Sequence, residues 1–389
     1  MAGSVLIVNP GSSSKKLALY RGTRQVACAH IEHEGGGVTA ALELAGTAST
    51  HRLSTDTFAR GTDWFLRRAE RAGVLRNASD VSAVGLRTVA SGEAFRRHRM
   101  IDEHYERQLR TAYERSPLHL GPALAELDHA RDVLPHVPVV GVSDSAFHLT
   151  LPETARRYAI PAGDAERRGL FRYGFHGISV GSVVRTVRRE LGRMPARTVV
   201  CHLGSGASIT ALQRGKSVDT SMGATPMEGL IMATRAGDVD PGILLEMAHE
   251  RSARQVETDL NRHSGLLALG GSDDIRELLK RERKGDSRAK LALDTYAYRV
   301  RKYIGAYAAV LGGLDLLVFT GTVGERSVPM RKRICRDLDY LGVRLDAARN
   351  RKTDTAFAAI NAPRTKARVL VVPTDELGEM ARATTALLA

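Results

Sequence analysis

The chain has 389 residues, of which 43% are hydrophobic and 26% charged. This length allows two domains of ordinary size, and the composition is typical of a globular protein rather than a disordered or fibrous one. A formal net charge of +14 favours capture of anionic substrates. Aromatic residues are only 5% and do not alternate with the basic runs at 96–99 and 281–284, so base stacking on nucleic acid is not encoded.

The cysteines and apolar stretches indicate the compartment. Cys28, Cys201 and Cys335 form no CxxC pair, which indicates free thiols in a reducing compartment and argues against a zinc site. The most apolar long stretch, 304–321, contains two glycines and an aspartate, so we expect a buried helix and strand rather than a membrane span. No secretory signal pattern is visible. We therefore expect a cytoplasmic protein that does not enter a membrane.

Residues 4–20 have the pattern of a strand, a tight turn and a second strand. Small hydroxyl residues fill the turn, and both their side chains and their N–H groups can donate to anions. The pattern recurs in the second half of the chain, where His202 matches Asn9 and the glycines that follow also match. Two copies of one hairpin, 193 residues apart, predict duplicated domains that face each other across a cleft.

Two further apolar runs place charged residues at the ends of predicted strands. The run 83–89 predicts a buried strand that carries Arg87 near its end, where the arginine requires an anionic ligand or a structural carboxylate. The run 139–143 predicts another buried strand, which ends on Asp144. Carboxyl ends of parallel strands are where open α/β sheets bind ligands, although a helix N-cap is an alternative role for Asp144.

Two histidines lie next to the starts of predicted helices. His119 precedes a predicted helix at 121–132, where a lone histidine is usually a packing residue. His176 lies between small residues at the entrance to a predicted helix at 180–191, a position that suits donation to a phosphoryl oxygen.

The segment 201–241 combines several features of a phosphate site. It begins with a Gly-Ser-Gly-Ala-Ser turn between strand-like runs, and small residues there let backbone N–H groups approach an anion. Hairpin turns favour glycine anyway, so the turn alone is a weak signal. Farther along, Arg235 lies on a glycine-flanked loop close to Asp238 and Asp240. Together these features indicate a phosphoryl-transfer site.

The last third predicts a nucleotide pocket and a closing helix. Residues 264–271 read as a glycine-rich loop, and a helix with acidic residues in its first turn begins near 273–276. The apolar strand 314–320 leads into a glycine turn at 321–325, as a pocket for a nucleotide base requires. Glu376 begins the closing helix, which we expect to pack on the first domain because it follows a completed second repeat.

The central segment resembles the signature block of the acetate kinase family, carboxylate kinases related in fold to sugar kinases and actin. The motifs that carry the resemblance are HLGSGAS, GKSVDTSMG, TPMEGL and TRAGDVDP, with VNPGSSSKK, SPLH, SDSAFHLTLP, YGFHG, SGLLALGGSDDIREL and PTDE elsewhere. The resemblance implies an α/β fold of two duplicated actin and sugar-kinase-type (ribonuclease H-like) domains with a central cleft. Residues 1–146, with the closing helix 376–389, would form one domain, and residues 147–375 the other. A homodimer, Mg²⁺ or Mn²⁺, and ATP as co-substrate are also implied.

The resemblance assigns roles to individual residues. The catalytic set is Asn9, Arg87, Asp144, His176 and Arg235, and the metal ligands are Asn9 and Glu376. The carboxylate substrate would contact Arg87, Val89, Leu118, His119, Phe175 and Pro226. The phosphates and the nucleotide would contact Ser12, Ser14, Lys16, His202, Gly204, Ser205, Gly206, Asp274, Ile275, Arg276, Gly321, Thr322, Val323 and Gly324.

Five positions depart from the family pattern: Leu86 and Ala90 replace histidines beside Arg87, and Ser205, Thr322 and Arg326 replace asparagine, glycine and asparagine. We predict Mg-dependent, in-line phosphoryl transfer between ATP and a short carboxylate such as acetate. The departures leave open a different donor, such as pyrophosphate, a different acid, or a catalytically weak nucleotide-binding regulator. Polyanion binding through the positive surface is a further alternative.

Overall fold

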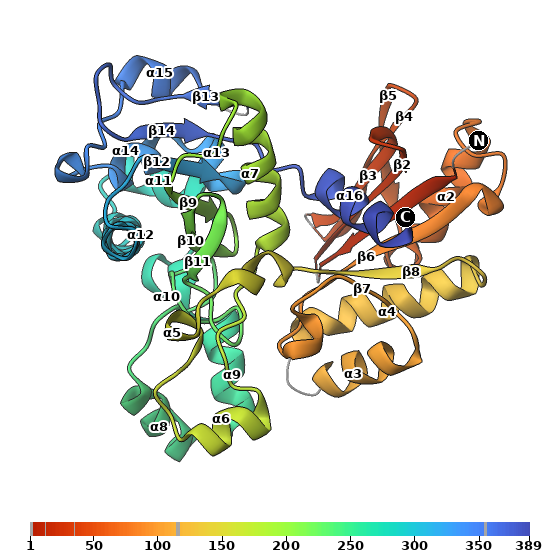
Figure 1. Ribbon diagram of the computed structural model, residues 1–389, viewed down its shortest axis with the longest axis horizontal. Coiled ribbons are helices and arrows are strands. Elements are labelled where there is room, and N and C mark those ends of the chain that lie inside the picture. The colour runs from red at the N-terminus through yellow and green to blue at the C-terminus, as the bar shows by residue number, and fades with distance from the viewer. Residues whose placement is uncertain (1–2, 12, 35, 114–116, 354–355) are drawn as a thin grey trace. The chain divides into compact units, whose positions relative to one another are not determined.

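The computed structural model describes residues 3–11, 13–34, 36–113, 117–353 and 356–389, without the side chains of residues 34 and 117–119 (Figure 1). The chain divides into two compact units. Unit 1 consists of residues 1–146 and 375–389, and unit 2 of residues 147–374. Each unit has its own sheet.

Unit 1 is built on an eight-stranded sheet with the order β5-β4-β3-β2-β1-β6-β8-β7. Its strands are β1 (Ser4–Pro10), β2 (Ser14–Arg21), β3 (Arg24–Glu34), β4 (Gly37–Leu44), β5 (Thr47–Leu53), β6 (Val81–Thr88), β7 (Arg99–Met100) and β8 (Val139–Ser143). The first five strands form an antiparallel meander, and β6 and β8 continue the sheet parallel to β1. The carboxyl ends of β1, β6 and β8 therefore lie at one edge.

Helices pack on both faces of this sheet because its side chains alternate between the faces. The helices are α1 (Thr55–Ala59), α2 (Gly61–Arg71), α3 (Glu103–Tyr113), α4 (Pro117–Val133) and α16 (Glu376–Leu388), with 3-10 helices η1 (Ala78–Asp80) and η2 (Glu93–Phe95). Leu6 and Val8 share a core with Phe65 of α2 and Leu127 of α4. On the other face α16 contacts β1, β6 and β8. A Cβ at Gly85 would lie 2.2 Å from Thr384 Oγ1, so glycine permits this close packing.

Unit 2 is built on a six-stranded sheet with the order β11-β10-β9-β12-β14-β13. Its strands are β9 (Arg197–Leu203), β10 (Ala207–Gln213), β11 (Lys216–Thr220), β12 (Leu316–Thr320), β13 (Ala358–Ala359) and β14 (Arg368–Val371). Its α-helices are α5 (Glu153–Arg156), α6 (Ala162–Arg168), α7 (Gly177–Leu191), α8 (Pro241–Glu250), α9 (Ala253–Arg262), α10 (Gly265–Gly270), α11 (Ile275–Arg283), α12 (Ser287–Leu311), α13 (Gly321–Arg326), α14 (Val328–Ile334) and α15 (Ala347–Lys352). The described residues also form the 3-10 helices η3 (Ala146–Thr150) and η4 (Asp339–Leu341).

The two sheets share a five-strand pattern. In unit 1 the order β3-β2-β1-β6-β8 matches β11-β10-β9-β12-β14 of unit 2, with an antiparallel half followed by two parallel strands in each. The expected α/β class with a duplicated sheet is therefore confirmed. In unit 2, α7 packs its valines on β9 and β12, α12 contacts β9 and β10, and Figure 1 shows these helices on either side of the sheet. Within the described residues, no helix combines the length and apolar character that crossing a membrane requires.

Two segments expected to be glycine loops contain short helices. Residues 321–325, predicted as a turn, lie in α13, because Glu325 Oε1 accepts the backbone N–H of Gly321 at 2.9 Å and closes the segment into a helical turn. Residues 264–271 contain α10, whose first turn donates backbone hydrogen bonds to the carbonyls of Met232 and Ala233. The tertiary hydrogen bonds that shape these two segments have no local sequence signal.

Candidate active site

Four polar side chains meet at the edge of the unit 1 sheet where β1, β6 and β8 end. Asn9 and Arg87 are the next-to-last residues of β1 and β6. Asp144 directly follows β8, and Glu376 is the first residue of α16. Since parallel strands end at a common edge, the sheet topology brings together residues that are up to 367 positions apart.

A continuous set of hydrogen bonds joins these four residues. Arg87 Nη1 donates to Asn9 Oδ1 at 3.2 Å, and Arg87 Nη2 donates to Asp144 Oδ2 at 2.9 Å. Asn9 Nδ2 in turn donates to Glu376 Oε2 at 3.3 Å. The Asp144 side chain is only 2% exposed, whereas that of Arg87 remains 20% exposed. The cluster is therefore rigid on its inner side and accessible at the guanidinium.

Arg87 stays charged in this position and retains a donor. Burial lowers the pKa of Arg87, but the carboxylates of Asp144 and Glu376 raise it more, so the net shift is upward. The buried Nε of Arg87 has no hydrogen-bond partner among the residues that the structure describes. A buried guanidinium donor without a partner is costly, and an anionic ligand would satisfy it.

Asn9 and Glu376 are a suitable donor set for a divalent cation such as Mg²⁺. Both offer oxygen atoms, and their side chains are within hydrogen-bonding distance of each other. In the described part of the chain, no group of three or more His, Cys, Asp or Glu residues is arranged to hold a metal. Mg²⁺ needs only a few ligands from the protein, because it keeps several water ligands and also binds substrate phosphates.

The β1–β2 hairpin places Lys16 directly across from Asn9 in the antiparallel ladder. The turn is closed by a hydrogen bond from the N–H of Gly11 to the carbonyl of Ser14 at 2.7 Å. Lys15 points to the opposite face, where it is buried and paired with Glu126, so Ser14 and Lys16 share the other face. Ser12, which the sequence also assigns to the phosphate path, lies outside the described residues.

The residues predicted to contact the acyl chain fall in both units. Val89 is half-buried just after β6, and Leu118 and His119 lie in α4, where their side chains are outside the described part of the structure. Phe175 and Pro226 are buried in unit 2. Phe175 is only 1% exposed, so within unit 2 its ring is mainly a core residue.

In unit 2, His176 and His202 stack on each other with ring centroids 4.2 Å apart. His176 precedes α7 with a left-handed φ of 60°, and its Nδ1 lies 3.0 Å from Ser208 Oγ. His202 is near the end of β9, and its Nδ1 lies 2.8 Å from Ser179 Oγ. Each imidazole is therefore oriented through its Nδ1, which leaves the direction of Nε2 fixed.

The turn after β9 brings Gly206 against both His176 and Arg235. A Cβ at Gly206 would lie 3.3 Å from His176 Nε2 and 3.7 Å from Arg235 Nη1. Arg235 Nη1 also donates to the carbonyl of Pro226 at 3.2 Å, and the N–H of Ala233 donates to the carbonyl of Ser205 at 3.0 Å. Of the predicted catalytic residues in unit 2, the structure thus brings His176 and Arg235 together at the glycine turn.

Gly321, another glycine of the predicted nucleotide site, lies beside the carboxyl end of β9. Gly321 has a φ of +76°, and a Cβ there would lie 2.7 Å from the carbonyl oxygen of Leu203, the last residue of β9. Thr322 is exposed on α13, Val323 is half-buried, and Gly324 packs on β12. The turn at Gly204 and the start of α13 therefore lie at one edge of the unit 2 sheet.

The other predicted nucleotide residues, Asp274, Ile275 and Arg276, lie at the start of α11. Asp274 caps this helix, accepting from the N–H of Arg276 at 2.8 Å and pairing with the guanidinium at 2.7 Å. These hydrogen bonds lower the pKa of Asp274. Ile275 is buried, whereas the Arg276 side chain is 91% exposed. Asp274 thus has a structural role, and Arg276 remains accessible to solvent.

Sequence reasoning missed the residues that orient the catalytic candidates. His148 is buried and lies 3.0 Å from the carbonyl of Phe175 through Nε2 and 2.9 Å from Ser217 through Nδ1, which fixes the loop before His176. Ser208 and Glu325, described above, have similar supporting roles. His148 and Ser208 lie inside motifs that were noted, SDSAFH and HLGSGAS, but nothing in a motif distinguishes a supporting residue from a ligand-binding one.

Comparison with known proteins identifies the family of the chain. A model of the acetokinase family matches residues 4–382. The chain is 40% identical to an acetate kinase of Heliobacterium modesticaldum over 402 aligned positions, covering 99% of both proteins. The crystal structure of Porphyromonas gingivalis acetate kinase has a TM-score of 0.87, 36% identity and 100% coverage of both chains. A propionate kinase structure from Francisella tularensis has a TM-score of 0.89 and 31% identity, covering 99% of this chain and 100% of that one. The chain belongs to the acetokinase family, as its motifs predicted.

Proposed function

We propose that this protein transfers a phosphoryl group between ATP and a short-chain carboxylate, giving an acyl phosphate and ADP. The observation that carries the proposal is the Arg87 cluster. Its charged guanidinium is fixed at the carboxyl edge of the parallel strands, and its Nε has no partner in the described part of the chain. Family membership and relatives named acetate kinase and propionate kinase support an enzyme over a catalytically weak regulator.

The chemistry needs positioning more than bond-making by the protein. A carboxylate is already a nucleophile, so no general base is required, and the protein must bring two anions together in line. Arg87 would bind the carboxylate or the phosphoryl oxygens, and its hydrogen bonds to Asn9 and Asp144 hold the planar guanidinium in one orientation. Preorganised charge of this kind stabilises the transition state without further rearrangement.

In unit 2 the donors are backbone N–H groups, an imidazole and a guanidinium. Small residues at Gly204 and Gly206 allow backbone N–H groups to approach nucleotide phosphates. Ser208 Oγ lies 3.0 Å from His176 Nδ1. In the tautomer that accepts the hydroxyl proton at Nδ1, His176 carries its own proton on Nε2 and would donate it in a hydrogen bond to a phosphoryl oxygen. We propose that His176, Arg235 and Arg87 act on the same phosphoryl group during turnover.

Asn9 and Glu376 would hold the divalent cation, Mg²⁺ or Mn²⁺. When bound, the cation supplies positive charge to the phosphate oxygens. Asn9 contributes in a second way, because its amide joins Glu376 to Arg87 and keeps the carboxylate and the guanidinium at a fixed spacing.

We propose a cytoplasmic homodimer as the working form. The three cysteines are free, as expected in a reducing compartment. In unit 2, Ile243 and Leu245 of α8 are 55% and 67% exposed, and exposed apolar side chains on one helix often mark an interface. Sedimentation of the native protein and of a Leu245→Glu variant would test this, and a native monomer would contradict it.

The proposed reaction is tested by trapping acyl phosphate as its hydroxamate with Mg-ATP and a panel of acids from formate to butyrate. We expect product with acetate or propionate. Repeating the assay with pyrophosphate distinguishes the donors, since product with pyrophosphate alone would replace ATP in the proposal. A folded protein that forms no product with any acid and donor would overturn the enzyme assignment.

A further inference from the structure

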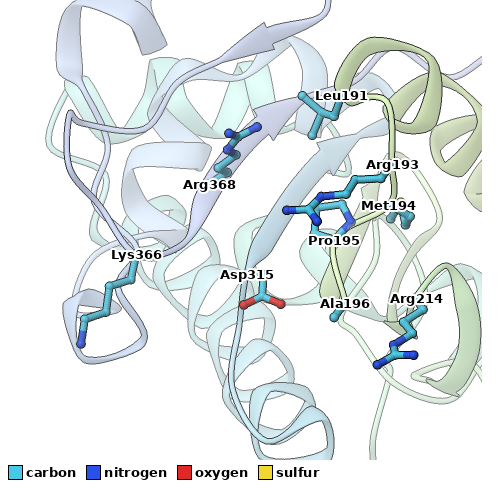
Figure 2. A pocket seen from close by; sticks show the side chains of 9 residues that line it. All are labelled: Leu191, Arg193, Met194, Pro195, Ala196, Arg214, Asp315, Lys366 and Arg368. Carbon is cyan, nitrogen blue, oxygen red and sulfur yellow. The ribbon is translucent and has the colours of Figure 1, made fainter.

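A hollow lies in unit 2 at the opposite end of its sheet from the glycine turns (Figure 2). Its volume is about 880 Å³. Four cationic residues line it: Arg193, Arg214, Lys366 and Arg368. Arg368 is the first residue of β14, and Arg193 lies in the segment between α7 and the start of β9, whereas the glycine turns follow the carboxyl ends of the parallel strands. The length of β9 separates the two edges by roughly 20 Å, so this basic pocket is distinct from the candidate active site.

The positive charge of the basic pocket is not neutralised by the protein. Its one carboxylate among the lining residues, Asp315, is engaged by Arg197, with Nη2 donating to Oδ1 at 2.5 Å and the backbone N–H donating to Oδ2 at 2.9 Å. These hydrogen bonds lower the pKa of Asp315. The side chains of the four cationic residues make no hydrogen bond or ion pair with any residue that the structure describes. The pocket therefore gathers four uncompensated charges.

The backbone holds Arg214 at this position at a conformational cost. Arg214 and Gly215 form the two-residue turn between β10 and β11, with φ of +52° and +83°. Asn or Gly is the usual first residue of such a turn, and a left-handed arginine is strained. The N–H of Arg214 donates to the carbonyl of Ala196 at 2.8 Å, which fixes the turn against the pocket wall.

The remaining lining is apolar and consists of the half-buried Leu191, Met194 and Pro195 and the exposed Ala196. Figure 2 shows Arg193 beside Pro195 at the centre, Arg368 and Lys366 on one side, and Arg214 on the other. An arginine guanidinium can donate two parallel hydrogen bonds to two oxygens of one phosphate group. Several cationic side chains from separate segments therefore favour a ligand with several negative charges. We propose that the basic pocket binds a small molecule that carries two or more phosphate groups.

The proposal is tested by hydrogen exchange of the full-length protein with inorganic tripolyphosphate as the probe. Peptides covering 191–197 and 366–369 report the basic pocket, and peptides covering 203–206 and 320–326 report the candidate active site separately. The pocket variant combines Arg193→Ala and Arg368→Ala. The matched control removes the same charge from exposed, unpaired positions of unit 2 through Lys284→Ala and Lys332→Ala.

We expect protection of the basic-pocket peptides in the native protein and the control. In the pocket variant, the half-saturating concentration for these peptides should rise about tenfold or more, since two charge-assisted contacts are lost. If the pocket variant does not fold, the single variant Lys366→Ala should still weaken protection. ATP as a second probe should protect these peptides at least as well as tripolyphosphate. Stronger protection by ATP would indicate that its adenosine part contacts the apolar residues of the pocket. Absent protection in the native protein, or equal weakening in the control, would overturn the proposal, whatever the enzymatic assay shows.

Discussion

The two hairpins that begin the matching halves of the sheets share a backbone but differ in chemistry. In unit 1, Asn9 at the end of β1 lies across from the exposed cation Lys16. In unit 2, His202 at the end of β9 lies across from Ser208, a buried hydroxyl that orients His176. The unit 1 edge thus relies on charged side chains held by the Arg87–Asp144 ion pair and by hydrogen bonds of Asn9, and the unit 2 edge on glycine turns and tethered imidazoles. The same sheet edge thus occurs in both units, and different side chains at each edge give the two copies different chemical properties.

This difference predicts that the unit 1 edge is most sensitive to loss of charge. Replacing Arg87 with alanine removes the guanidinium and its ion pair with the buried Asp144, so kcat/KM for acyl phosphate formation should fall by about 10³-fold or more. Steady-state kinetics with the hydroxamate assay measure the effect. Arg71→Ala, at an exposed position on α2, is the matched control and should stay near the native value. Equal kinetics for the two variants would remove Arg87 from the reaction.

In unit 2 the guanidinium of Arg235 should matter through its shape as well as its charge. Arg235→Lys keeps the charge but loses the planar fork, so we expect kcat to fall by about 10²-fold. Arg262→Lys, on the exposed side of α9, is the matched control. A native kcat for Arg235→Lys would show that only its charge is used.

A methyl group at Gly206 should test the role of the backbone turn. Gly206→Ala places a Cβ 3.3 Å from His176 Nε2, so the imidazole must shift by a few tenths of an ångström. We expect kcat to fall by roughly 10- to 10²-fold, because small misplacements at the reacting centre are costly. Gly163→Ala, whose Cβ would meet only the flexible end of Arg167, should have no effect. An unchanged kcat would mean that the turn is not part of the reacting centre.

The smallest expected effect concerns the hydroxyl that tethers His176. Ser208→Ala removes one hydrogen bond, so kcat should fall by about 3- to 10-fold while KM for the carboxylate changes little. Ser49→Ala, at an exposed position in β5, is the control. A larger change in KM than in kcat would indicate that Ser208 supports binding rather than the orientation of His176.

Much of the fold and part of the candidate site were predictable from sequence patterns. Apolar runs located β8 and most of β6. Arg87 near the end of β6 and Asp144 directly after β8 were candidates because parallel strands end at a common edge. The repeated hairpin predicted a duplicated sheet. The link from Asn9 to Glu376 was not predictable from spacing, because it spans 367 positions and depends on where α16 packs. The helix at Gly321 was missed since Glu325 closes it through a side-chain acceptor.

The central proposal, that the clusters in the two units act on one phosphoryl group, is tested most directly by a double-mutant cycle on kcat/KM. The variants are Arg87→Ala, Arg235→Lys and their combination. If both guanidinium groups stabilise the same transition state, the combined loss should be smaller than the product of the single losses by about tenfold or more, because the second contact contributes little once the first is gone. Losses that simply multiply would show independent sites and would contradict the account.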